Sequence, residues 1–140
     1  MKLKSSDNKL TYTAAILNAI SDDKSLALFD TIALADCYSD ILLTKTKLTR
    51  TQYYSRISSL IKDGLVKRKN GKYCLTSLGK VVYNAKTIID GALNHYWKLK
   101  AIDSLELAND NLLLTKEEFT KLVDSLIDNQ KIKGIITKSF

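Results

Sequence analysis

The chain has 140 residues, with 22 lysines and arginines against 15 aspartates and glutamates, and a formal net charge of +7. This length fits one domain with an extension, and a hydrophobic fraction of 45% is enough to bury a core. Two cysteines and one histidine are too few for a disulfide framework, a four-ligand zinc site or a multi-histidine centre. We therefore expect no cofactor and no metal, and no spacing of side chains indicates an enzyme.

The first predicted element is a helix that carries the longest uncharged run of the chain, residues 10–21. Leu10, Ala14, Leu17 and Ile20 follow at helical spacing and predict one apolar stripe. The run is too short to span a bilayer as a helix. Lysines precede it, so a cleaved signal peptide is an alternative, but polar residues within the run and two aspartates after it favour an ordinary helix.

The next two predicted helices cover residues 24–36 and 39–45. An aspartate before the first of them, Asp22 or Asp23, is suited to cap its free backbone amides. Apolar residues at helical spacing are expected to form the buried sides of the two helices: Leu26, Phe29, Ile32, Ala33, Ile41 and Leu42.

The next helix is predicted over residues 49–62. Thr49 and Gln52 have the spacing of a capping box, and Gly64 can supply the left-handed conformation that ends a helix. The residues expected to face inward are Tyr53, Ile57 and Leu60, with Ile61 at the margin. The opposite face carries short polar side chains beside an arginine and a tyrosine, namely Arg50, Thr51, Tyr54, Ser55, Ser58 and Ser59.

A β-hairpin is predicted after this helix, with strands over residues 65–69 and 72–75. Asn70-Gly71 between the strands is a strong hairpin signal, because a type I′ turn requires positive φ at both central residues. Four basic residues lie near the tip of this hairpin: Lys67, Arg68, Lys69 and Lys72.

A long helix is predicted from Thr76 or Ser77 to about Ile102. It carries an apolar stripe with alternating spacings of four and three, which is typical of a coiled-coil seam. The stripe residues, which we expect to mediate homodimerisation, are Leu78, Val82, Ala85, Ile89, Ala92, Tyr96 and Leu99. The alternative is that the stripe folds back onto residues 10–20 of the same chain.

Two shorter helices are predicted to follow. Thr115 and Glu118 form a second capping-box pattern ahead of an apolar face. Residues 131–138 have helical spacing, although Gly134 and the branched side chains also allow a strand. We expect Cys37, Cys74 and His95 to have structural roles, with a redox function for the cysteines as the alternative.

The excess positive charge is confined to one segment. Residues 43–72 hold nine basic residues and one acidic residue, a net charge of +8, whereas the rest of the chain carries −1. Residues 103–128 carry −5. This asymmetry indicates one anion-binding region, which contains the helix over residues 49–62 and the hairpin.

The order of helix, helix, turn, helix, basic hairpin and helix is that of a winged helix-turn-helix, a mainly α fold with a small β-hairpin wing. The segment Leu48–Arg68 resembles the recognition helix and first wing strand of winged-helix transcription regulators. With the continuation through Leu75-Thr76-Ser77-Leu78-Gly79, it is most similar to small archaeal regulators and more distantly similar to MarR- and PadR-type repressors. The resemblance covers about residues 45–85.

The resemblance and the charge pattern together predict a cytoplasmic DNA-binding transcription regulator that is not an enzyme. Residues 1–76 would form the DNA-binding domain, and residues 77–140 a helical extension that dimerises. The resemblance assigns DNA contacts to Arg50, Thr51, Tyr54 and Ser55 and to the wing residues Lys67, Arg68, Lys69 and Lys72, and we add Gln52 and Arg56. Double-stranded DNA is the expected partner, no membrane is involved, and the sequence identifies no small-molecule effector. The alternative is a winged-helix adaptor that binds protein in a transcription or replication assembly.

Overall fold

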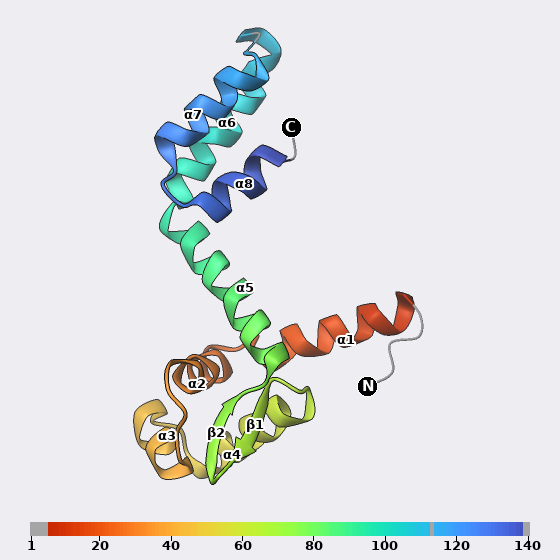
Figure 1. Ribbon diagram of the computed structural model, residues 1–140, viewed down its shortest axis with the longest axis vertical. Coiled ribbons are helices and arrows are strands. Elements are labelled where there is room, and N and C mark those ends of the chain that lie inside the picture. Colours follow the sequence, from red (N-terminus) through yellow and green to blue (C-terminus); the bar gives the residue numbers. More distant parts are fainter. Residues whose placement is uncertain (1–5, 113, 139–140) are drawn as a thin grey trace. The chain divides into compact units, whose positions relative to one another are not determined.

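The computed structural model describes residues 6–112 and 114–138, and the chain forms two compact units that divide after Tyr83 (Figure 1). The first unit contains α1 (Ser6–Ala19), α2 (Asp23–Leu34), α3 (Ser39–Thr46), α4 (Arg50–Lys62), β1 (Val66–Lys69), β2 (Lys72–Leu75) and the start of α5 (Ser77–Asn94). The second contains the rest of α5, then α6 (Tyr96–Leu112), α7 (Lys116–Leu126) and α8 (Gln130–Lys138). The predicted fold class, mainly helical with a small hairpin, is confirmed.

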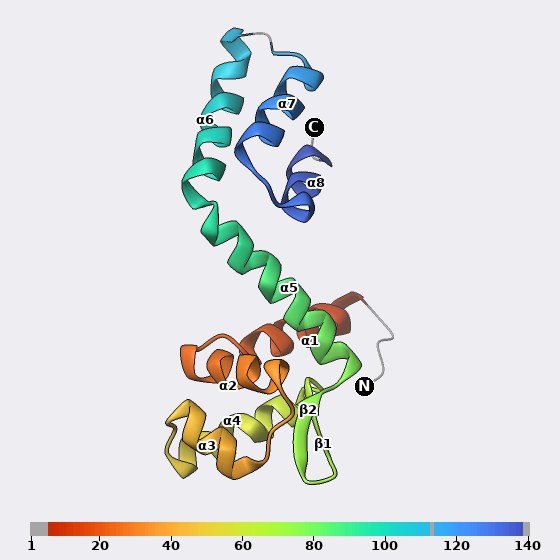
Figure 2. The ribbon, with the colours of Figure 1, turned by 60° about the vertical axis from the view of Figure 1, so that its left-hand side comes forward.

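The core of the first unit lies where α2, α3, α4 and the hairpin meet (Figure 2). Tyr53, Ile57 and Leu60 of α4 are buried as predicted, and Leu42 is the buried residue of α3. The other fully buried large side chains of this core are Leu28, Phe29, Ile32, Leu65 and Val66. Each fully buried side chain of this size stabilises the fold by about 1.5–3 kcal/mol, so this small unit has an ordinary hydrophobic core.

The predicted caps begin the helices where expected. The carboxylate of Asp22 accepts from the amide of Ser25 at 3.1 Å and caps α2. In α4, the amide of Gln52 donates to Thr49 Oγ1 at 3.2 Å, and the amide of Thr49 donates to Gln52 Oε1 at 3.2 Å, which completes the capping box. Gly64 ends α4 with a φ of 78°.

The hairpin is antiparallel with Val66 opposite Leu75 and Lys69 opposite Lys72. Asn70 and Gly71 have φ values of 54° and 78°, as the type I′ turn requires. Cys37 forms a β-bridge with Tyr73 on the other side of β2. The Cys37 amide donates to the Tyr73 carbonyl at 3.2 Å, and the Tyr73 amide donates to the Cys37 carbonyl at 2.8 Å. β2 is therefore paired on both sides.

The predicted buried face of α1 is wrong in phase, and that of α3 is correct only for Leu42. In α1, Leu10 and Leu17 are 73% and 58% exposed, whereas Ala19 is buried and Ile16 and Ile20 pack against the core. This helix carries two apolar sides at helical spacing, and contact with the rest of the unit decides which one is covered. In α3, Leu42 is buried as predicted, but Ile41 is 41% exposed, and Leu43 packs against the core in its place.

The prediction of one helix from Thr76 or Ser77 to Ile102 is also wrong. The helix is interrupted at His95, where the His95 amide donates to the Ala92 carbonyl at 3.0 Å, three residues back instead of four. Gly91 and Asn94 precede the interruption, and both have low helix propensity. The apolar stripe is thereby divided between α5 and α6.

The second unit has its own core, in which α7 runs back along α6 in both views (Figures 1 and 2). Its buried side chains are Ile102, Phe119, Val123, Ile127 and Ile132. The predicted capping box of Thr115 and Glu118 starts α7, with bonds of 3.0 and 3.2 Å. Residues 130–138 form a helix rather than a strand. Within the described ranges, no helix is long and apolar enough to cross a membrane.

Candidate nucleic-acid interface

The outer face of α4 is polar and exposed. Arg50, Thr51, Tyr54 and Ser55 all lie on it, as the sequence predicts. The Tyr54 ring is 51% exposed and meets the Tyr53 ring edge-on, at a centroid distance of 5.1 Å. The helix therefore presents a rigid aromatic side chain and an arginine next to short hydroxyl side chains.

Tyr53 holds this helix from its buried side. Its hydroxyl donates to Ser39 Oγ at 3.1 Å, which connects α4 to the first residue of α3. Burial raises the pKa of the Tyr53 phenol, so the group stays protonated and remains a hydrogen-bond donor well above neutral pH. The exposed face of α4 thus has a fixed orientation relative to α3, the preceding helix of the helix-turn-helix.

Arg56 and Gln52, which were also predicted as DNA-binding residues, are partly buried, and both make contacts within the unit. Arg56 Nε donates to Asp22 Oδ2 at 3.2 Å, and Arg56 Nη1 donates to the Gln52 carbonyl at 3.3 Å. The hydroxyl of Ser25, and then Arg56, hold the pKa of Asp22 below its usual value despite partial desolvation. The guanidinium of Arg56 is therefore engaged at the start of α2, and the Gln52 side chain is engaged in the capping box.

The wing residues fall on two faces of the hairpin, because side chains alternate along a strand. Arg68 shares a face with Tyr73, Val66 and Leu75, which belong to the core. Lys67, Lys69 and Lys72 share the other face with Cys74, as the register requires. The four basic side chains are thus neighbours at the tip but project in two directions.

Two of these basic side chains make cation–π contacts with tyrosine rings. The Arg68 guanidinium lies 5.7 Å from the centroid of the Tyr73 ring, and the Lys72 ammonium lies 5.1 Å from the centroid of the Tyr38 ring. Such contacts contribute about 0.5–1 kcal/mol at exposed sites. They hold the charged tip in place, while the charges remain accessible to a phosphate.

The hairpin is fixed to α4 and α5 through a short network. The Thr76 hydroxyl donates to the Gly64 carbonyl and accepts from the Gly79 amide, the latter at 2.9 Å. The Thr76 amide donates to the Leu65 carbonyl at 3.0 Å. Gly79 is buried in α5, and a Cβ built there would meet the Leu65 carbonyl oxygen at 2.1 Å. The wing therefore depends on a close approach that only glycine permits.

The predicted dimerisation residues are spread over both units. Leu78 is 38% exposed and Val82 packs against the first core, whereas Ala92 and Leu99 pack against the second. Ala85, Ile89 and Tyr96 are exposed, the last two by 60% and 45%. Within the second unit, a groove of about 400 Å³ is lined only by apolar side chains and one tyrosine: Ile88, Ile89, Ala92, Leu93, Tyr96, Leu99, Ile132, Ile135 and Ile136.

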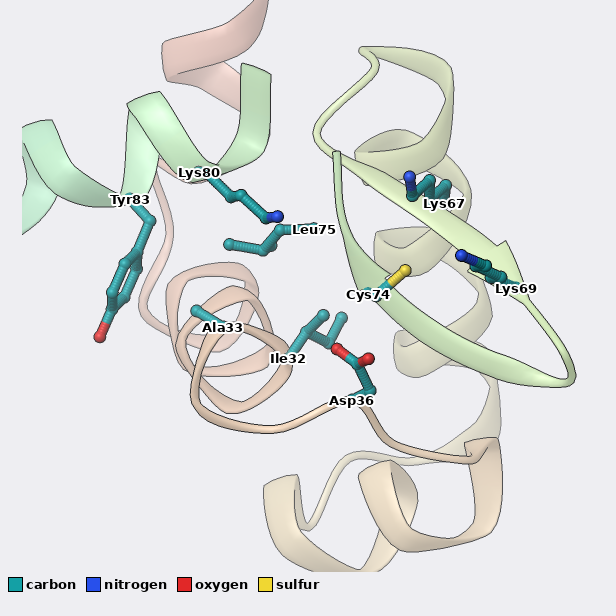
Figure 3. Close-up of a pocket in the computed structure, with 9 residues that line it drawn as sticks. All are labelled: Ile32, Ala33, Asp36, Lys67, Lys69, Cys74, Leu75, Lys80 and Tyr83. Atoms are coloured by element: carbon teal, nitrogen blue, oxygen red, sulfur yellow. The ribbon is translucent and has the colours of Figure 1, made fainter. Parts of the chain in front are cut away.

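Lys80 is a basic residue near the wing that the sequence analysis did not select. It lies with Lys67 and Lys69 around a cavity between α2, the hairpin and α5 (Figure 3). It stands on a helix outside the basic segment of residues 43–72, so charge counting along the chain does not reveal it. Only the folding of α5 against the hairpin brings the three lysines together.

Comparison with known proteins gives only structural likeness. No family model matches the sequence, and no curated protein matches it. The homodimeric winged helix-turn-helix DNA-binding domain of a possible ArsR-family transcriptional regulator from Mycobacterium bovis has a TM-score of 0.52 at 18% identity, covering 64% of this chain and 91% of that one.

Two further solved structures have lower TM-scores. An ArsR-like transcriptional regulator from Rhodococcus sp. RHA1 has 20% identity, covers 70% of this chain and 95% of that one, and has a TM-score of 0.49. NolR from Sinorhizobium fredii has 21% identity, covers 63% and 96%, and also has a TM-score of 0.49. The element order, the hairpin and the Mycobacterium bovis domain together show that this chain has a winged helix-turn-helix fold, followed by C-terminal helices.

Proposed function

We propose that this protein is a cytoplasmic DNA-binding transcription regulator, with α4 as its recognition helix and the hairpin as its wing. The observation that carries the proposal is the coincidence of an exposed polar α4 face and a basic wing in one unit. The Mycobacterium bovis neighbour is itself described as a DNA-binding domain, which supports the proposal. The sequence resemblance to small archaeal regulators and to MarR- and PadR-type repressors supports the same function.

The proposed mechanism follows from the shape of B-DNA. The major groove admits one α-helix, whose exposed side chains reach the base edges. Arg50 can donate two bonds to a guanine, and Thr51, Tyr54 and Ser55 supply further polar and apolar contacts. The wing cations would bind phosphates, which provide most of the affinity without reading sequence. Because Arg56 is paired with Asp22, its proposed phosphate contact requires that ion pair to open.

The first experiment is a fluorescence-anisotropy titration of duplex DNA at several salt concentrations. We expect binding that weakens steeply as salt rises, and selection from random duplexes should yield a preferred site. On that site, Arg50→Ala should reduce the discrimination against a mismatched base by about 1–3 kcal/mol. Lys98→Ala, a change of one exposed cation in α6, is the matched control and should leave discrimination unchanged.

Absence of salt-dependent binding at low ionic strength would contradict this function. In that case the adaptor alternative would gain support, and the acidic segment of residues 103–128 would become the surface to examine.

We also propose that residues 77–140 mediate homodimerisation, through the groove formed by α5, α6 and α8. The proposed occupant is the same groove of a second copy. Four residues of the predicted stripe, Ile89, Ala92, Tyr96 and Leu99, line this groove, and no charged side chain does. An uncharged apolar surface is suited to pairing with itself about a two-fold axis. The Mycobacterium bovis domain is described as homodimeric, which supports this assignment.

Ile89→Lys is expected to weaken the dimer at least tenfold, because it places an unpaired charge in an apolar interface. Ile89 is 60% exposed in one chain, so the substitution leaves the core intact. Leu107→Lys, at an 80% exposed position outside the groove, is the control. Sedimentation and light scattering report the mass, and a wild-type particle of 15.7 kDa at high micromolar concentration would overturn the proposal.

A further inference from the structure

The segment between α2 and α3 contacts both parts of the proposed DNA interface, the hairpin and α4. Cys37 pairs with Tyr73 of β2 through two backbone hydrogen bonds. The Ser39 hydroxyl accepts a hydrogen bond from the Tyr53 hydroxyl of α4 at 3.1 Å. Tyr38 stands between these two contacts in the chain, so its backbone is held on both sides.

The Tyr38 ring lies against the tip of the hairpin. The Lys72 ammonium is 5.1 Å from the centroid of this ring. The Cε1 atom of the ring is 3.4 Å from the position that a Cβ on Gly71 would occupy, so the ring is in contact with the turn. Lys72 is half-buried, whereas the three basic residues of β1 are exposed. The ring therefore restricts the wing cation that β2 supplies.

Restricting a lysine in advance favours its contact with a phosphate. A lysine side chain that moves freely in solution loses rotamer freedom when it binds, and this loss weakens the binding. A side chain that is already held over a ring has lost part of that freedom before the phosphate arrives. The ammonium group has three donors, so a ring on one side of it leaves donors for a phosphate on the other.

We propose that Tyr38 is a positioning residue of the DNA interface, whose ring, placed against the turn, holds Lys72 in the orientation that binds a phosphate. The inference rests on the proposed function and adds to it a residue that acts through another side chain. Tyr38 is 47% exposed, so replacing it leaves the hydrophobic core intact. The ring and not the hydroxyl carries this role, because the attraction of a cation arises from the ring quadrupole.

The first measurement is made without DNA, by nuclear magnetic resonance on the full chain. The side-chain protons of Lys72 should be shifted upfield by the ring of Tyr38. Tyr38→Phe should retain these shifts, and Tyr38→Leu should abolish them while leaving the amide shifts of the core residues unchanged. Unshifted Lys72 protons in the wild type would overturn the proposal.

The second measurement is an anisotropy titration of selected and random duplexes at several salt concentrations. Tyr38→Leu should weaken binding to every duplex by about two- to fivefold, the range for one cation–π contact at an exposed site. Discrimination between bases and the salt slope should not change, because Lys72 and its charge remain. Tyr38→Phe should bind as wild type does.

Trp97→Leu is the matched control for loss of an aromatic ring. Trp97 is 77% exposed in the second unit, and the Lys100 ammonium lies 5.8 Å from the centroid of its ring. This variant therefore also removes an exposed cation–π contact, and it should leave the DNA affinity unchanged.

A double-mutant cycle determines whether Tyr38 acts through Lys72. In a Lys72→Ala background, Tyr38→Leu should have no further effect on DNA affinity, because no cation remains for the ring to position. A direct contact of Tyr38 with DNA, or a general loss of structure, would weaken binding by the same factor in both backgrounds.

The outcomes separate this inference from the proposed function. An equal effect of Tyr38→Leu with and without Lys72, or a loss in Tyr38→Phe as large as that in Tyr38→Leu, would overturn the positioning role. Unchanged affinity of Tyr38→Leu in a protein that binds DNA would overturn it as well and leave the proposed function intact. A wild-type protein that binds no DNA would contradict the proposed function and, with it, this role.

Discussion

Replacing Lys67, Arg68, Lys69 and Lys72 by alanine is expected to weaken binding to every duplex by about 30- to 1000-fold. Four phosphate contacts at about 0.5–1 kcal/mol each account for this range. Each contact also releases a counterion, so the slope of log affinity against log salt should fall by about 3 to 4. Anisotropy titrations over a salt series on specific and random duplexes measure both quantities.

The control is a variant with the same loss of four charges in the second unit, at Lys98, Lys116, Lys121 and Lys138, all of which are exposed. If the effect depends on the wing and not on net charge, this control should retain nearly all of the affinity. Equal losses in the two variants would show that the wing has no special role. Circular dichroism of both variants verifies that the hairpin changes have not unfolded the chain.

Gly79→Ala is expected to destabilise the first unit by about 3 kcal/mol or more, the upper range for a forced steric overlap. The added methyl group would stand 2.1 Å from the Leu65 carbonyl oxygen and 3.1 Å from its carbon, and both are backbone atoms that a rotamer change cannot move. Leu65 is fully buried, so its segment has little room to shift. For a unit of this size we expect a decrease in Tm of more than about 10 °C in thermal unfolding.

Gly134→Ala is the matched substitution, because the same methyl group placed in α8 meets no atom within 4 Å. It should leave stability unchanged or increase it by up to about 1 kcal/mol, since alanine favours a helix over glycine. If Gly79→Ala melted at the wild-type temperature, the close approach of α5 to Leu65 would be refuted.

Local signals predicted much of the first unit. Thr49 with Gln52, Asp22 before α2, Gly64 after α4 and Asn70-Gly71 in the hairpin act over four residues or fewer, so the sequence alone determines them. The structure also gives a physical reason for the segment Leu75-Thr76-Ser77-Leu78-Gly79 that carries the resemblance. The Thr76 hydroxyl forms hydrogen bonds with Gly64 at the end of α4 and with Gly79 in α5. Gly79, which has no side chain, allows α5 to approach the backbone of Leu65 closely.

The rest of the fold could not be predicted from local sequence, because it depends on packing between residues that are far apart in the chain. The apolar stripe of α5 and α6 keeps perfect heptad spacing through His95, yet the helix is interrupted there, because spacing records side-chain type and not backbone continuity. The covered side of α1 similarly depends on its neighbours, not on its own pattern.

The residues of the candidate site could be predicted from the sequence, but the contacts and orientations of their side chains could not. The sequence identified the exposed residues of α4, but the ion pair of Arg56 with Asp22 joins positions 34 residues apart and has no sequence signal. The cavity around Lys80 likewise needs three separate elements to assemble.

The pairing of the hairpin has a consequence for the solubility of the protein. β2 is flanked by β1 on one side and by Cys37 on the other, whereas β1 has β2 as its one strand partner in the described part of the chain. β1 is thus an edge strand, and exposed edge strands of different molecules tend to join into aggregates. Three consecutive cations, Lys67, Arg68 and Lys69, cover this edge and repel an identical strand. The charges of the wing therefore also keep separate molecules from sharing a sheet, so their removal affects colloidal stability whether or not DNA is present.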